Sequence, residues 1–394
     1  MERCTIVVGT RDRFSTLIAC LERIRACTPE PHDLIVVAGG APEALRQEWQ
    51  RRYGNQAKFI FERQFLNQAQ ARNLGMRAAT TRLAVLMDND VLVRPGWLRP
   101  LVECQQETGA VMVVPVILES ETEIHAAGNT LYVTYVNGRA YGHKELRMHG
   151  MPYHQGSNMR RGPVDYGELH CQLVEIEPTL RLQAYDEDIL EVGEVDSGLT
   201  WARAGLGQWF EPTSVVHYQI DAPIAAVDIR LFDWRWNMRS ILTGYRYFEQ
   251  KWGIDITEQG RFRRFLYGYN RQLGLLPRLF PSPLALGVDR AAGRLRRGAR
   301  AALAPLRAPQ WVAANLKAWW IGYNDWPRST AEKRPSAATG ERAVLAIGAT
   351  LPGVPVITPP APRTWRHHYR RWRDDDPRSR HDRKGIHQRH AAAQ

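Results

Sequence analysis

Two aspartates separated by one residue follow an apolar run in the stretch RLAVLMDNDVLVRPGWL, residues 82–98. The run Leu83–Met87 predicts a buried strand, so Asp88 and Asp90 would lie at the edge where parallel strands end and α/β proteins bind ligands. One carboxylate could bind a divalent ion and the other a ribose hydroxyl, and hard oxygen ligands suit Mg²⁺ or Mn²⁺. The alternative is that both aspartates only form turns ahead of a helix near Pro95.

The residues around these aspartates predict the elements that must position them. Short β-branched runs alternate with helix-like stretches, which is the pattern of a parallel sheet covered by helices. The expected strands are Thr5–Val8, Leu34–Val37, Lys58–Phe61, Leu83–Met87 and Val111–Val116, and the expected helices are near residues 14–24, 43–52, 68–79 and 97–107. The fold class is therefore α/β with a mostly parallel central sheet.

The pattern is less regular between residues 118 and 170, which we interpret as loops or short strands. It returns in residues 170–218, where strands at Leu173–Ile176 and Ser214–Tyr218 enclose an acidic helical segment. A helical stretch is expected near Val227–Trp252.

Composition argues against several classes of protein. The chain of 394 residues is 44% hydrophobic, and its apolar runs are of strand length, so no membrane-spanning helix is expected. The five cysteines (Cys4, Cys20, Cys27, Cys104 and Cys171) contain no CxxC pair, which favours buried thiols over disulfides or a zinc site. The start MERCTIVVGTRDR lacks the features of a signal peptide, so we expect a cytosolic protein.

The net charge of +12 comes mainly from two segments of the last third of the chain. Residues 363–390 hold ten Lys and Arg against four Asp, and residues 289–307 hold six Arg against one Asp. Nucleic-acid-binding proteins usually carry their basic residues on a folded surface. The charge is therefore weak evidence for a nucleic-acid partner.

Several segments, in a fixed order, resemble the family 2 glycosyltransferases of GT-A fold over about residues 4–252. They are TIVVGTRDR (5–13), ARNLGMRAA (71–79), MDND (87–90), YDEDILEVGEVD (185–196) and EPTSVVHY (211–218). The resemblance implies a Rossmann-like sandwich. It also implies an enzyme that transfers a sugar from a nucleotide diphosphate donor to an acceptor hydroxyl, inverting the anomeric carbon, with Mn²⁺ or Mg²⁺ as cofactor.

The resemblance assigns roles to individual residues. Those that match the family's donor and metal site are Thr10, Arg11, Arg72, Asn73, Asp88, Asp90 and His217. The first four would contact the nucleotide, and Asp88 would contact the ribose and share the metal ion. Asp90 would bind the metal, and His217 would bind metal or diphosphate, unless it is a hydrogen-bonded core histidine.

An inverting displacement also needs a base within hydrogen-bond reach of the acceptor hydroxyl. Glu194 in GEVD resembles the family's catalytic carboxylate, and Asp196 resembles its companion. The family often has two adjacent acids before the spacer, where this chain has only Glu194. The competing bases are Asp186, Glu187 and Asp188, which could instead be first-turn charges favoured by the helix dipole.

A second difference from the family follows the second strand. The family commonly places an acid near the pyrimidine ring, whereas this chain has Ala38, Gly39 and Gly40. Glycine permits close backbone approach, so main-chain contacts, or Asp12, could read the base instead.

The C-terminal third differs from the catalytic domain, which we place at residues 1–252. Residues 253–329 predict a helical, basic and aromatic extension, with an amphipathic helix over about 288–306 that could bind an anionic membrane or pack on protein. Residues 330–394 are rich in Pro, Ala, Gly and Thr, then in Arg and His, and predict a mostly disordered basic tail.

The sequence thus predicts a metal-dependent inverting glycosyltransferase of the hexosyltransferase type, cytosolic or at the inner face of the membrane. Its expected partners are a nucleotide-sugar donor and a glycan or lipid-linked acceptor in polysaccharide, glycolipid or other glycoconjugate synthesis. The alternative is a noncatalytic protein of the same fold that binds nucleotide sugars or glycans.

Overall fold

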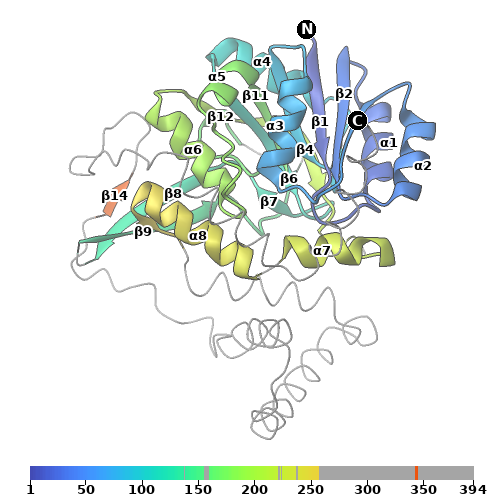
Figure 1. The fold of residues 1–394 in the computed structure, drawn as a ribbon. Coiled ribbons are helices and arrows are strands. Elements are labelled where there is room, and N and C mark those ends of the chain that lie inside the picture. Colours follow the sequence, from blue (N-terminus) through green and yellow to red (C-terminus); the bar gives the residue numbers. More distant parts are fainter. Residues whose placement is uncertain are drawn as a thin grey trace, which may run out of the picture. The chain divides into compact units, whose positions relative to one another are not determined.

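Four parallel strands form one half of the central sheet (Figure 1). A computed structural model describes residues 1–256, except 137, 155–158, 221, 223 and 237, and also residues 342–344. The parallel strands are β1 (Cys4–Gly9), β2 (His32–Gly39), β3 (Lys58–Glu62) and β4 (Leu83–Asp88). The helices that follow β1, β2 and β3 are α1 (Leu17–Cys27), α2 (Glu43–Tyr53) and α3 (Gln68–Ala78), and the next helix after β4 is α4 (Leu98–Thr108). The predicted α/β class is confirmed.

The other half of the sheet is mixed, and its strand order is β10-β12-β6-β11-β4. Strand β11 (Cys171–Glu175) lies between β4 and β6 (Met112–Leu118) and runs antiparallel to both. Strand β12 (Gln208–Tyr218) runs parallel to β6 and antiparallel to the short strands β5 (Val91–Val93) and β10 (Gly162–Pro163). Strand β7 (Ile124–Ala126) pairs with the end of β6.

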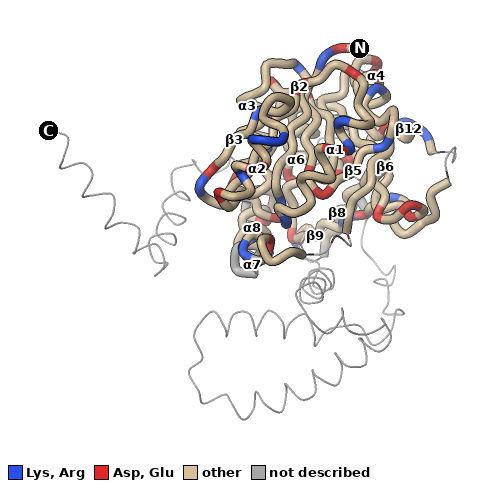
Figure 2. Tube along the Cα trace, turned by 90° about the vertical axis from the view of Figure 1, so that its right-hand side faces the viewer, with Lys and Arg blue, Asp and Glu red and all other residues tan. Residues whose placement is uncertain are grey.

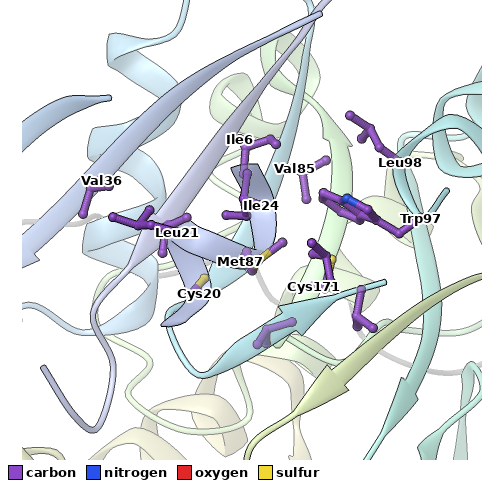
Figure 3. Packing of buried hydrophobic residues seen from close by; sticks show 14 of the residues in the cluster. Ile6, Cys20, Leu21, Ile24, Val36, Val85, Met87, Trp97, Leu98 and Cys171 are labelled. Carbon is purple, nitrogen blue, oxygen red and sulfur yellow. The ribbon is translucent and has the colours of Figure 1, made fainter. Parts of the chain in front are cut away.

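Two apolar layers cover the two faces of this sheet. One layer joins the sheet to α1, α2 and α4, and it includes Trp49 of α2. Figure 3 shows Leu21 of α1 and Leu98 of α4 in this layer. The other joins it to α3, α5 (Ile176–Arg181) and α6 (Gly193–Arg203), with Met76 and Trp201 in the core. Such burial is the main stabilising term of an α/β fold.

A second sheet occupies much of the segment that we predicted to be loops or short strands. Strands β8 (Asn129–Val136) and β9 (Arg139–Leu146) form an antiparallel hairpin of eight-residue strands. Leu131 and Val133 alternate with polar residues, so only one face of the hairpin is apolar, and that face packs on α6 and α8 (Met238–Trp252). Strands β13 (Ile254–Asp255) and β14 (Arg342–Val344) pair with its two edges.

The helical stretch predicted near Val227–Trp252 is confirmed, and the structure divides it into separate helices. It contains a 3₁₀ turn, Ala226–Asp228, then α7 (Ile229–Arg235), and α8 as a separate helix. The Asp228 carboxylate accepts hydrogen bonds from the N–H groups of Phe14, Ser15 and Ala225, which ties the start of this segment to the loop after β1. This tertiary contact fixes a boundary that helical periodicity cannot reveal.

Some predictions fall on residues outside the described ones. These are nearly all of the extension 253–329, including the amphipathic helix at 288–306, and the tail 330–394 apart from β14. Within the described part, acidic and basic positions are interspersed along the trace (Figure 2), and none of its helices combines the length and apolar character needed to cross a membrane. The five cysteines are buried and unpaired, as predicted.

Candidate active site

The side-chain alternation of β4 directs Asp88 toward helix α3. Leu83, Val85 and Met87 pack in the apolar layer between the sheet and α1 and α4. Ala84 and Leu86 face α3 on the other side of the sheet, and Asp88, two residues after Leu86, points to the same side. Helix α3 lies unusually close to the sheet, because a Cβ on Gly75 would fall 2.1 Å from Val7 Cγ1. The glycine of the ARNLG segment therefore lets α3 place its polar residues over the end of β4.

The Asp88 carboxylate is fully engaged with protein groups. Gln68 Nε2 donates to both of its oxygens, at 2.9 and 3.1 Å, and Arg11 Nη1 donates to Oδ2 at 3.1 Å. Arg72 Nη2 lies 3.4 Å from Oδ1. Asp88 is only 3% exposed, so a ribose hydroxyl could reach it only by sharing or replacing one of these donors.

The middle residue of the DND segment orders the loop after β1. Asn89 Oδ1 accepts from the Arg11 N–H at 3.1 Å, and Asn89 Nδ2 donates to the Arg13 carbonyl at 2.6 Å and to Thr16 Oγ1 at 3.0 Å. The side chains of Asp88 and Asn89 thus bond to distant segments, which does not support the interpretation that DND only makes local turns.

Asp90 has the environment expected of a cation ligand. It is 1% exposed, and neither carboxylate oxygen has a hydrogen-bond partner among the described residues. Arg13 Nη1 lies 3.6 Å from Oδ2. Burial, and then the charges of Asp88 and Asp12, raise the pKa of Asp90 to about 7. A buried carboxylate without donors is costly, and a divalent ion would offset that cost, so this residue fits the predicted metal.

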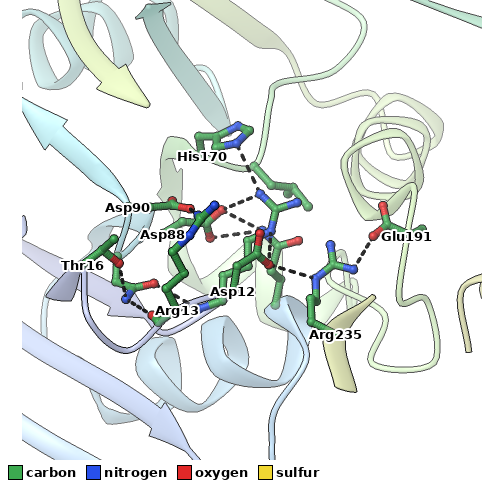
Figure 4. A network of polar contacts seen from close by, with 12 residues as sticks. Asp12, Arg13, Thr16, Asp88, Asp90, His170, Glu191 and Arg235 are labelled. Carbon is green, nitrogen blue, oxygen red and sulfur yellow. Dashed lines mark hydrogen bonds and ion pairs between the residues drawn. The ribbon is translucent and has the colours of Figure 1, made fainter. Parts of the chain in front are cut away.

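Asp88 and Asp90 belong to a larger buried cluster of guanidinium and carboxylate groups (Figure 4). Asp12 Oδ1 lies 3.7 Å from Arg11 Nε and 3.7 Å from Arg235 Nε, and Arg235 Nη1 donates to Glu191. The cluster contains the guanidiniums of Arg11, Arg13, Arg72 and Arg235 and the carboxylates of Asp12, Asp88, Asp90 and Glu191. Because Asp12 already pairs with two arginines, it is poorly placed to read a nucleobase.

The other predicted nucleotide contacts have different surroundings. Thr10 Oγ1 and Arg72 Nη1 are buried and have no hydrogen-bond partner among the described residues, so both are available to a ligand. Asn73 Nδ2 instead donates to the Tyr185 carbonyl at 2.9 Å and to Glu187 Oε1 at 3.0 Å. In this structure Asn73 orders the acidic segment after α5.

His217 is half-buried in β12, and within the described part of the chain it forms no hydrogen bond or ion pair with Asp88 or Asp90. Its neighbours Val216 and Tyr218 pack with the layer under α1 and α4, so His217 points to the other face of the sheet. The Tyr218 ring lies 4.0 Å from the His170 ring, and burial, followed by Asp90, raises the Tyr218 pKa. The structure thus brings Tyr218 to the cluster, and the metal role of His217 stays a prediction.

A cavity of about 320 Å³ runs from this cluster to the predicted base. Arg11 and Arg72 line one part of it, and Glu194, Glu191 and Tyr245 line another. Glu194, at the start of α6, is held by Lys144 of β9, whose Nζ lies 2.6 Å from Glu194 Oε1. The second sheet therefore supplies the group that orients the predicted base.

Asp196 does not line the cavity. It is completely buried and accepts hydrogen bonds from Trp252 Nε1 at 2.7 Å and from Lys251 Nζ at 3.1 Å. Burial raises its pKa to about 6 against the effect of Lys251. These contacts anchor α8 to α6. Of the competing acids, Asp186 lines the cavity and is paired with Lys251 at 2.8 Å, while Glu187 and Asp188 are exposed.

Gly39 and Gly40, at and after the end of β2, make room for other residues of the protein and do not leave a space for the nucleobase of a donor. A Cβ on Gly40, which has φ of 68°, would lie 2.3 Å from the Phe65 ring, and a Cβ on Gly39 would lie 2.6 Å from the Gln64 carbonyl. Phe65 also packs on Trp234, at 5.5 Å between ring centroids. The place where the family carries an acid is filled here by the segment before α3.

Sequence reasoning missed several residues of the cluster. His170 Nε2 lies 3.3 Å from Arg11 Nη1, and the His170 carbonyl accepts from the Asp88 N–H at 3.1 Å. Lys144 and Gln68 were also not identified. The only sequence signal for His170 was its position directly before a strand, and its meaning depends on β11 pairing with β4.

Part of this site lies in a segment that matches a known protein family. Residues 5–164 match the family model described as Glycosyl transferase family 2. This span contains every predicted nucleotide residue and both aspartates of the DND segment, and it ends before Glu194 and His217. Residues 5–164 therefore match a glycosyl transferase family 2 domain. No curated protein matches the chain.

Two solved structures resemble the chain at low identity. GalNAc-T7 with UDP, GalNAc and Mn²⁺ is 14% identical with a TM-score of 0.45, over 68% of this chain and 55% of that one. The mannosyltransferase PcManGT from Pyrobaculum calidifontis, in complex with GDP-Man and Mn²⁺, is 14% identical with a TM-score of 0.41, over 81% of this chain and 85% of that one. The chain thus spans about half the length of the first of these proteins.

Proposed function

We propose that the protein is a metal-dependent, inverting glycosyltransferase that moves a sugar from a nucleoside diphosphate to an acceptor hydroxyl. The observation that carries the proposal is the buried Asp90 carboxylate. It lacks hydrogen-bond donors among the described residues, and it lies beside arginines at the carboxyl edge of a family 2 domain. A divalent ion bound there would stabilise the diphosphate leaving group as a Lewis acid.

The donor's diphosphate would bind at the arginine end of the cavity. Arg11 and Arg72 line the cavity, and Arg72 Nη1 has no other hydrogen-bond partner in the described part of the chain. Guanidinium groups suit this role because they stay charged and donate in pairs to phosphate oxygens. Arg11 now pairs with Asp88, so we infer that its guanidinium turns toward the phosphates when the donor binds.

Glu194 is the proposed base. It would accept the proton of the acceptor hydroxyl as that oxygen bonds to the anomeric carbon, while the bond from that carbon to the diphosphate oxygen breaks. The electron pair of the broken bond leaves with the nucleoside diphosphate, whose charge the arginines stabilise. The acceptor is proposed to be a sugar hydroxyl of a glycan or lipid-linked glycan, because Tyr245 and two carboxylates line this part of the cavity.

Calorimetric titration with UDP, GDP, CDP and TDP, with and without Mn²⁺, tests the donor site. We expect one nucleotide to bind in the presence of Mn²⁺, and Asp90→Asn to abolish the effect of the metal. Asp33→Asn, at a surface ion pair with Arg3, is the matched control and should bind like wild type. Failure of all four nucleotides to bind the folded protein would disprove the proposal.

Turnover is tested separately from binding. With the nucleotide identified, release of the nucleoside diphosphate from the matching nucleotide sugars should require Glu194, and Glu194→Gln should retain donor affinity while losing turnover. Wild-type protein that binds the donor but transfers no sugar to glycan or lipid-linked acceptors would indicate the noncatalytic alternative.

A further inference from the structure

Three residues from three separate segments converge beside the cavity, outside the aspartate cluster. Glu119 follows β6, His125 lies in β7, and His149 lies in the turn after β9. Each offers one ligand atom, and these atoms all lie within 4.8 Å of one another. His125 and His149 also line the cavity, so the group is open to solvent and to ligands.

The geometry of the group is close to what a metal ion requires. His125 Nδ1 lies 3.0 Å from Glu119 Oε2. Donor atoms about 2.0–2.1 Å from a tetrahedral zinc ion lie roughly 3.3 Å apart, so only a small movement would place an ion between them.

The tautomer of His149 also suits a ligand. Its Nδ1 lies 3.0 Å from the His125 carbonyl, which can only accept, so Nδ1 carries the hydrogen. Nε2 then presents its lone pair. A hydrogen bond from one ring nitrogen to a carbonyl, with the other nitrogen on the metal, is the usual arrangement around metal-bound histidines.

A second group, His125 with Glu168 and His170, is less suitable. Arg11 Nη1 can only donate, and it lies 3.3 Å from His170 Nε2, which must therefore accept. His170 Nδ1 then carries the hydrogen and faces Glu168 Oε2 at 3.2 Å. A metal on Nδ1 would force a hydrogen onto Nε2, directly against the guanidinium of Arg11.

From these observations we propose that Glu119, His125 and His149 form a second metal site, distinct from Asp90, that binds a zinc-like divalent ion with one position open toward the cavity. Two imidazoles and a carboxylate favour Zn²⁺ or Co²⁺ over Mg²⁺ and Mn²⁺, whereas the ligand at Asp90 is a hard carboxylate oxygen. The two sites would therefore select different ions.

Zinc binding to the full-length chain tests the proposal independently of glycosyl transfer. Protein carrying Asp90→Asn, which removes the first site, is freed of metal with a chelator and dialysed against buffered Zn²⁺, and bound zinc is measured by mass spectrometry. His149→Ala is then added to this parent, and so is His125→Ala. The control is His32→Ala, a half-buried histidine at the start of β2.

The tail contains five further histidines, at positions 367, 368, 381, 387 and 390, so the informative quantity is the difference from the parent. We expect His149→Ala and His125→Ala to bind one zinc ion fewer per chain at limiting Zn²⁺, or at least about tenfold more weakly, since even outer-shell losses cost 10–100-fold. His32→Ala should equal the parent, and Co²⁺ should give a visible spectrum that His149→Ala alters.

Because His149 is exposed, its substitution should leave the fold intact, which thermal unfolding without metal would verify. The proposal is wrong if folded His149→Ala binds as much zinc as the parent. Loss of all zinc from Asp90→Asn alone would assign the ion to the first site instead. None of these outcomes depends on whether the protein transfers sugar.

Discussion

Lys144 Nζ of β9 lies 2.6 Å from Glu194 Oε1 at the start of α6. A residue of the second sheet therefore orients the predicted base. Lys144→Met should release the carboxylate and lower kcat, on the order of 100-fold, because displacement of a reacting group by about 1 Å can have that effect. Lys144→Arg should restore part of the rate. Steady-state kinetics at saturating donor would measure both variants. An unchanged kcat in Lys144→Met would show that Lys144 does not position the base.

Metal binding at Asp90 should depend on pH. A divalent ion binds the ionised carboxylate, and the Asp90 pKa is raised to about 7, mainly by burial. Mn²⁺ affinity should therefore rise about tenfold per pH unit up to about pH 7 and then level off. Calorimetry between pH 5 and 8.5 would show this, and an affinity that is flat across the range would contradict the raised pKa.

The same carboxylate should destabilise the metal-free fold. Its pKa is higher in the folded protein, about 7, than the ordinary value of 3.8, so the folded state binds the proton more tightly and loses stability as pH rises between these values. Asp90→Asn should therefore raise the Tm at pH 8 without metal, and the advantage should shrink toward pH 4. Calorimetric scans would contradict this if the variant melted below wild type at pH 8.

Asp196 is expected to act on stability rather than on chemistry. Asp196→Asn removes a buried charge that pairs with Lys251 and accepts from Trp252, and losing hydrogen bonds to a charged group typically costs about 1.5–3 kcal/mol, while Lys251 keeps its pair with Asp186. Denaturant unfolding should show this loss, while kcat per folded molecule stays near wild type. A normal unfolding midpoint with lost turnover would favour the catalytic role that the family resemblance implies.

Gly75 should be required for the position of α3. A Cβ there would meet Val7 Cγ1 at 2.1 Å, so Gly75→Ala must push α3 from β1, and overpacking of this kind costs about 1–3 kcal/mol. Gln68 and Arg72 would move away from Asp88, which should weaken binding of the nucleoside diphosphate. In Gly162→Ala, the added Cβ meets nothing within 4 Å, so this control should keep both stability and binding.

The local elements could be predicted from the sequence because they depend on short-range periodicity. Strands β1 to β4 and helices α2 to α4 begin and end within a few residues of the predicted positions. The aspartates of the DND segment could also be placed at the end of a parallel strand. Their position beneath Arg11, Gln68 and Arg72 could not, because it depends on how closely α3 approaches β1.

The missed residues come from pairings between distant segments. His170 reaches the cluster because β11 is inserted antiparallel beside β4, and Lys144 reaches Glu194 because a hairpin of the second sheet packs on α6. Tyr218 was also missed, and it reaches the cluster because the pleat of β12 directs its ring to His170, while the metal role of the neighbouring His217 stays a prediction. A shift of one residue along a strand reverses the direction of a side chain.

The place of β11 in the sheet has a consequence for how this protein is made. β11 fills the position between β4 and β6, yet it is synthesised after both, and more than fifty residues separate it from the end of β6. A nascent chain that ends at residue 164 holds the whole family-matched segment but lacks the strand that joins the two halves of the sheet. The sheet can close only after residues 171–175 leave the ribosome, so the matched segment cannot complete the central sheet by itself.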